Sequence, residues 1–217
     1  MFRIQKSTES LAYAINQQSR VIMAIILRDM RTRFFNHALG FIIVVLMPLG
    51  HMAIIVAMQI AFGRSAPYGD SIILFTATGV VSPIAVMYIA RFMVVSLITN
   101  KSMLSYPPVT MVDILLARGI LETLATCVGA CLLFTILLMA GEDAVPKDWS
   151  TVIAGLAAVI FLGMGMGVLN GVIATANPGW VTPFMLSLVV FYLASGVLFV
   201  PDNLPSQVQN ILYWNPV

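Results

Sequence analysis

The sequence predicts an all-α integral membrane protein, in which an N-terminal amphipathic interface helix precedes a polytopic bundle of transmembrane helices. Charged residues make up only 9% of the 217 residues, against ~25% in an ordinary globular domain. Five runs of 19 to 26 residues contain no Asp, Glu, Lys or Arg, and a bilayer core of ~30 Å needs ~20 helical residues to cross it. These runs are 38–62, 71–90, 123–141, 151–176 and 180–200.

Residues 9–35 are expected to form the interface helix, which lies along the membrane rather than across it. On a helical wheel, basic Arg20, Arg28 and Arg31 cluster opposite a broad apolar face. This segregation suits the headgroup boundary, where arginine faces anionic lipid or a protein partner. The apolar face consists of Leu11, Ile15, Ile22, Ile26, Met30 and Phe34.

The chain is expected to form a single transmembrane domain, residues 1–217, with spans at about 38–62, 71–98, 109–140, 151–176 and 180–200. The second and third spans extend past their uncharged runs, and two prolines end the loop between them. In the fourth span, Gly163, Gly167 and Gly171 are spaced four residues apart, which lets two helix backbones approach closely. The last segment, 201–214, is too short to cross and is expected to be a re-entrant helix in the outer leaflet.

The basic residues predict the orientation of these spans. Nine Lys and Arg residues fall on the side of the N-terminus and two on the other side. An excess of Lys and Arg marks the cytoplasmic side. We therefore expect a multi-pass protein of the inner (cytoplasmic) membrane with its N-terminus in the cytoplasm.

Ionisable side chains within the predicted spans include Arg118, Glu122 and His51. Arg118 and Glu122 are four residues apart and can pair along one helix face, either as an anchor of helix depth or as part of coupling or gating. His51 lies near mid-membrane. It is expected to bond to a neighbouring helix, to line a pathway or to transfer a proton.

The sequence lacks the patterns of an enzyme site. It contains neither a nucleotide-binding loop, nor a nucleophile elbow, nor the clustered histidines and carboxylates of a metal site. Interleaved basic and aromatic residues for nucleic acid are also missing. We therefore expect no catalytic residues, no metal and no nucleic-acid partner.

Four segments together resemble the permease subunit of type-2 ABC exporters, in the branch that exports capsular polysaccharide, O-antigen and teichoic acid. The first is the arm ending in Leu-Arg-Asp-Met-Arg-Thr-Arg-Phe at 27–34, followed by Gly40, and the second is Thr78-Gly79. The third is Asn-Lys-Ser-Met-Leu at 100–104, followed by Tyr-Pro at 106–107. The fourth runs from Ser-Gly-Val-Leu-Phe at 195–199 through Leu-Pro at 204–205 to Tyr-Trp-Asn-Pro at 213–216.

The resemblance implies a homodimer of permeases bound to two copies of a cytoplasmic ATP-binding subunit. That partner would use ATP and Mg, and this chain would bind no cofactor. The cargo would be a cell-surface polysaccharide, lipid-linked in our reading, and periplasmic or outer-membrane export proteins could join the assembly. The family has six spans, whereas this sequence shows five, so we expect either a sixth span beyond Val217 or an unusual member.

The resemblance also implies site residues. The arm and the loop between spans two and three would contact the ATPase subunit through Arg28, Asp29, Arg31, Asn100, Lys101, Ser102, Leu104 and Tyr106. The channel or gate candidates are Tyr88, Arg91, Phe92, Arg118, Glu122, Tyr192, Ser195, Tyr213 and Trp214. Export of a drug or a small lipid is the alternative within the family, and a membrane-embedded transferase or a non-catalytic scaffold are alternatives of other classes.

Overall fold

The computed structural model describes residues 2–32, 40–197, 199 and 204–215, and these residues form helices and connecting turns without strands. Four of the helices are long and apolar enough to cross a membrane, which confirms the predicted helical membrane fold. In chain order the elements are α1 (Phe2–Thr32), α2 (Gly40–Ala61), α3 (Ile72–Thr99), the 3₁₀ turn η1 (Lys101–Ser105), α4 (Met111–Met139), α5 (Trp149–Ala176), η2 (Pro178–Trp180), α6 (Val181–Leu193) and α7 (Ser206–Leu212).

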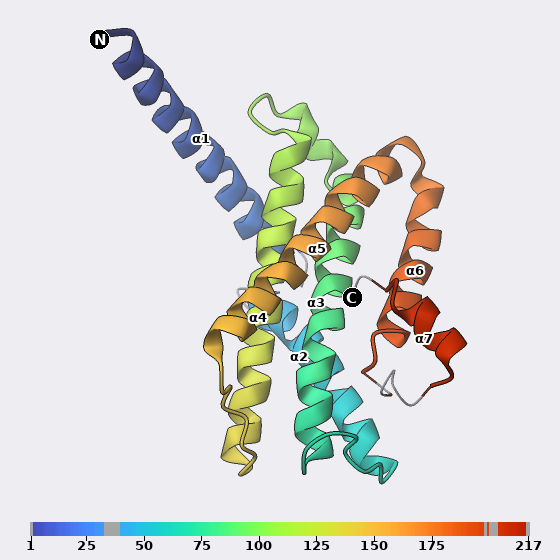
Figure 1. The fold of residues 1–217 in the computed structure, drawn as a ribbon. Coiled ribbons are helices and arrows are strands. Elements are labelled where there is room, and N and C mark those ends of the chain that lie inside the picture. Colours follow the sequence, from blue (N-terminus) through green and yellow to red (C-terminus); the bar gives the residue numbers. More distant parts are fainter. Residues whose placement is uncertain (1, 33–39, 198, 200–203, 216–217) are drawn as a thin grey trace.

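Helix α3 is the centre of the bundle, because α2, α4, α5 and α6 all pack against it. The connections after α2 and α4 lie at one end of the bundle, and those after α3 and α5 lie at the other (Figure 1). Polar caps fix where two of the long helices begin. Thr110 and Asp113 form a reciprocal capping box at the start of α4, and Asp148 caps α5.

The contact between α3 and α5 depends on the small residues predicted from the sequence. A Cβ atom added at Gly163 would lie 3.2 Å from Cβ of Ile89, and one added at Gly167 would lie 2.7 Å from Cβ of Met93. A Cβ atom added at Gly171 would lie 3.2 Å from Cδ2 of Leu115 on α4 and 3.7 Å from Cδ1 of Leu97 on α3. The predicted close approach of two helix backbones is therefore confirmed, and its partner is α3 of the same chain.

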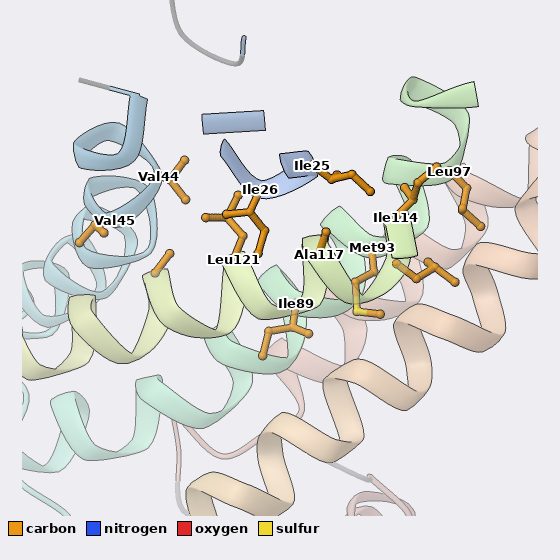
Figure 2. Packing of buried hydrophobic residues seen from close by; sticks show 12 residues of the cluster. Ile25, Ile26, Val44, Val45, Ile89, Met93, Leu97, Ile114, Ala117 and Leu121 are labelled. Carbon is orange, nitrogen blue, oxygen red and sulfur yellow. The ribbon is translucent and has the colours of Figure 1, made fainter. Parts of the chain in front are cut away.

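The interface helix has two unlike halves. Residues 11–20 are exposed, and the first turns of α1 project away from the bundle (Figure 1). The following turns pack against α4 and α2, where Ile25 and Ile26 are buried. Figure 2 shows the side chain of Ile26 beside Leu121 of α4 and that of Ile25 pointing toward Ile114 of the same helix. Of the predicted apolar face, Leu11 and Ile15 are exposed, and Phe34 lies outside the described residues.

The helical part of the fifth predicted span is shorter than expected. The apolar helical stretch runs from Pro178 to Leu193, whereas the prediction was 180–200. The chain turns after Leu193, and Gly196 adopts a φ of +81°, a conformation that side-chain-bearing residues rarely take. Hydropathy could not reveal this stop, because the residues after the turn are as apolar as those before it. Of the predicted re-entrant segment, 204–215 is described and contains α7.

Candidate functional site

A buried ion-pair network joins the interface helix to the bundle. Arg118 of α4 lies 2.6 Å from the Glu122 carboxylate on its own helix and 3.3 Å from the Asp29 carboxylate on α1. The predicted pair of Arg118 and Glu122 is thus confirmed. All three residues are buried, and Glu122 is only 1% exposed. Charges at such depth are stable only when paired, so the network fixes where α1 meets α4.

Two further polar contacts attach α1 to the residue that follows α3 and to the first turn of α4. The Arg28 guanidinium donates to the side-chain oxygen of Asn100 at 3.1 Å. The Gln18 amide donates to the carboxylate of Asp113, which also accepts from the backbone N–H and the hydroxyl of Thr110. A displacement of α1 would therefore act on the start of α4 and on the end of α3.

The predicted ATPase-contact residues divide into two groups in this structure. Asp29 and Asn100 are buried, because Asp29 pairs with Arg118 and Asn100 accepts from Arg28. Their side chains are therefore turned into the protein. The surface that a partner could touch is formed by exposed Arg31, Lys101, Ser102 and Tyr106, with half-buried Arg28 and Leu104 beside them. The contact role of these residues stays a prediction.

Aromatic side chains from three helices meet on one face of α3. The ring of His51 on α2 lies 6.1 Å from that of Tyr88 on α3 and 5.7 Å from that of Tyr192 on α6. Tyr88 in turn contacts Phe92 edge to face at 5.8 Å. The hydrogen bond that His51 was expected to make to a neighbouring helix does not occur among the described residues, where its neighbours are these two tyrosine rings.

Phe92 connects the aromatic face to the ion-pair network. The Arg118 guanidinium lies over its ring at 4.9 Å, and that of Arg91 lies over it at 5.7 Å. Both distances are within the range of a cation–π attraction. Five of the predicted channel or gate residues (Tyr88, Arg91, Phe92, Arg118 and Glu122) are therefore brought together, and Tyr192 joins them through His51.

The remaining channel candidates lie apart from this group. Ser195 is half-buried and donates to the carbonyl of Tyr192 one turn earlier. Tyr213 and Trp214 follow α7 and are 91% and 88% exposed. The side chain of Asn215 donates to the carbonyl of Phe191 at 3.1 Å, so the end of the described chain is attached to α6.

Sequence reasoning missed the partners that are distant in the chain. Nothing in the spacing of Asp29 and Arg118, 89 positions apart, marks them as neighbours. Local signals did exist for two other contacts. The Thr-x-x-Asp pattern at 110–113 is a capping box, and Trp180, whose indole N–H donates to Asn170, follows the turn at 177–179. In the described part of the chain, no group of three or more His, Cys, Asp or Glu side chains could hold a metal ion.

The fold and this group of residues define a helical membrane protein in which a surface helix is coupled to a transmembrane bundle. No protein-family model matches the chain. Curated relatives do match it over most of its length. It is 28% identical to the polysialic acid transport protein KpsM of Escherichia coli, over 92% of this chain and 78% of that protein.

Two further relatives come from other organisms. The chain is 28% identical to the capsule polysaccharide export inner-membrane protein CtrC of Neisseria meningitidis serogroup B, over 96% of this chain and 77% of the relative. It is also 28% identical to BexB of Haemophilus influenzae, which has the same description, over 98% of this chain and 79% of the relative. The homologues of this chain are thus named for the transport of polysialic acid and the export of capsule polysaccharide.

Proposed function

We propose that this chain is the membrane-spanning permease subunit of an ATP-driven exporter that moves a cell-surface polysaccharide, such as a lipid-linked capsule chain, across the inner membrane. The observation that carries the proposal is the match of 92% to 98% of the chain to capsule export proteins from three bacteria. The inner-membrane names of two of these relatives and the four long apolar helices support a multi-pass location in the inner membrane.

The permease would act with partners. We propose a homodimer bound to two copies of a cytoplasmic subunit that hydrolyses ATP with Mg, because the sequence lacks a nucleotide-binding motif of its own. The excess of basic residues on one side supports a cytoplasmic N-terminus. Periplasmic or outer-membrane export proteins would receive the polymer.

The partner would drive the bundle through α1 and the segment 100–106. Exposed Arg31, Lys101 and Tyr106 offer the contact surface. A push on α1 would reach α4 through the ion pair of Asp29 with Arg118 and would reach α3 through Phe92, whose ring the Arg118 guanidinium covers. Such a movement of packed helices as rigid bodies is a common form of conformational switching.

The conduit itself would use the aromatic face. A polymer of sugars needs hydrogen bonds and flat ring surfaces rather than a purely aliphatic wall. Half-buried Tyr88 and Phe92 supply ring surfaces, and the exposed aromatic pair at 213–214 supplies further ones near α6. Export of a drug or a small lipid is not favoured, because the relatives are named for polysaccharide.

A deletion strain tests the proposal. Loss of the gene should remove the surface glycan and leave drug resistance unchanged, and the tagged protein, purified in mild detergent, should retain an ATP-binding subunit. Lys101→Glu should weaken both the retention and the export, because it reverses the charge of the proposed contact surface. Lys147→Glu is the matched control, since Lys147 is also exposed but lies in the connection at the opposite end of the bundle. A wild-type protein that never retains an ATPase subunit, in a strain whose deletion keeps its glycan, would rule the proposal out.

A further inference from the structure

One sector of α3 is only partly covered by the described residues. Helices α2, α4, α5 and α6 all pack against α3. Between these contacts, Tyr88, Phe92 and Val95 are half-buried and Arg91 is exposed. These four residues follow the spacing i, i+3, i+4 and i+7, so they form one stripe along the helix. The stripe is therefore partly accessible, and Arg91 is its exposed member.

Arg91 is the unusual member of this stripe. Within the described residues it makes neither a hydrogen bond nor an ion pair, and its one charge-related contact is the ring of Phe92. Arg91 precedes the end of α3 at Thr99 by eight residues, or about 12 Å along the helix axis. A cation in a membrane-spanning helix is costly and marks a functional site by default. Arg91 thus lacks an anionic partner among the described residues.

The neighbours of Arg91 restrict which anion fits. The Tyr88 hydroxyl donates to the backbone carbonyl of Met47 at 3.2 Å, which holds that ring against α2. The Arg118 guanidinium also lies over the ring of Phe92. Two fixed rings therefore flank a guanidinium that can bind a carboxylate with two parallel hydrogen bonds. The negative faces of the rings attract the polarised C–H groups on the flat side of a sugar.

We propose that Tyr88, Arg91 and Phe92 form a binding subsite for the acidic sugar residues of the transported polymer. The proposal rests on the proposed export function and narrows its substrate class to a glycan that carries carboxylate groups. The rings bind the sugar face and Arg91 binds the carboxylate. A neutral glycan would use the rings alone, and the phosphate of a bilayer lipid would use the cation alone. Successive acidic residues would pass the same cation during export.

Polymer binding to the full-length chain in neutral phosphatidylcholine nanodiscs tests this subsite. The probes are labelled polysialic acid as an acidic polymer and labelled dextran as a neutral one. Arg91→Gln should weaken binding of the acidic probe about tenfold, the equivalent of ~1.4 kcal/mol, and should leave dextran binding unchanged. Arg91→Lys should fall between the wild type and Arg91→Gln, because it keeps the charge but not the paired hydrogen bonds. Arg64→Gln is the matched control, since Arg64 is exposed in the connection after α2.

Three other outcomes would contradict the proposed subsite. Equal binding of the acidic probe by Arg91→Gln and Arg64→Gln would remove Arg91 from recognition, as would a wild type that binds neither polymer. An effect of Arg91→Gln that appears only as loss of co-purified anionic lipid would assign Arg91 to the bilayer instead. The gene deletion tests the export proposal independently of the subsite. Deletion can still remove the surface glycan when Arg91 takes no part in binding.

Discussion

Arg118 and Arg91 lie over the same ring, that of Phe92, yet their surroundings are opposite. Arg118 is 7% exposed and pairs with carboxylates from two helices. Arg91 is exposed and has only the aromatic contact among the described residues. The bundle therefore has two unlike sides. On the closed side, around Arg118, ion pairs hold helices together. On the open side, around Arg91, a cation is accessible to a ligand.

The two sides also differ in what a substitution should do. On the closed side, removal of one partner leaves buried charges uncompensated, so the loss falls on stability. On the open side the same kind of change removes only an aromatic contact of an exposed cation, so the loss should fall mainly on binding. Variants that separate stability from transport are therefore the way to test the comparison.

The largest effect is expected for Arg118→Gln. It leaves the carboxylates of Asp29 and Glu122 buried without their common cation, which should cost about 3–5 kcal/mol of stability. The loss of stability is measured as a lower midpoint of thermal unfolding in mild detergent, with size-exclusion chromatography as the readout. Arg20→Gln is the matched control on α1, because Arg20 is exposed, and it should change stability by less than about 0.5 kcal/mol.

A double variant sharpens this test. Asp29→Asn should destabilise on its own, and its effect should be less than additive with that of Arg118→Gln, because the two residues share one interaction. Additive losses would contradict the direct coupling of α1 to α4. An Arg118→Gln variant as stable as Arg20→Gln would contradict the closed side altogether.

The sequence predicted the parts of the fold that depend on local patterns. The expected spans 38–62, 71–98, 109–140 and 151–176 correspond to helices 40–61, 72–99, 111–139 and 149–176. Long uncharged runs can satisfy their backbone in a bilayer only as helices or closed barrels, so these boundaries follow from composition. The end of α6 at Leu193 was missed, because a turn inside an apolar run leaves hydropathy unchanged.

The site was predictable only where its members are close in sequence. Arg118 and Glu122 were found by their spacing of four. The Asp29 carboxylate was expected to face a partner subunit, whereas it is turned toward Arg118. The packing of Ile25 and Ile26 on α4 decides which way the residues of this turn of α1 point (Figure 2). Periodicity gives the faces of a helix but not the neighbour that each face meets.

A smaller effect is expected on the face of α3 that packs against α5. Gly167→Ala places a methyl group 2.7 Å from Cβ of Met93, so backbone as well as side chain must shift, at a cost of about 1–3 kcal/mol. Gly165→Ala is the matched control, because a Cβ at Gly165 meets nothing within 4 Å. The same unfolding midpoint compares the two variants. Equal midpoints would show that the packed side of α3 is looser than the structure indicates, and the contrast with its open stripe would weaken.

The smallest expected effect is a difference in stability between variants of the two tyrosines beside His51. Tyr88→Phe removes a hydrogen bond to the carbonyl of Met47 and should cost about 1 kcal/mol. The buried Tyr192 hydroxyl has no hydrogen-bond partner among the described residues, so Tyr192→Phe should cost nothing or stabilise slightly, because an unsatisfied buried polar group is removed.

Unfolding midpoints and export rates of the two tyrosine variants, measured at equal expression, decide what the Tyr192 hydroxyl does. If Tyr192→Phe keeps its stability but exports less glycan, its hydroxyl bonds to the polymer during transport, and the open side extends from Arg91 across His51 to α6. If Tyr192→Phe instead loses more stability than Tyr88→Phe, the hydroxyl is bonded within the folded protein, and the open side ends at Tyr88.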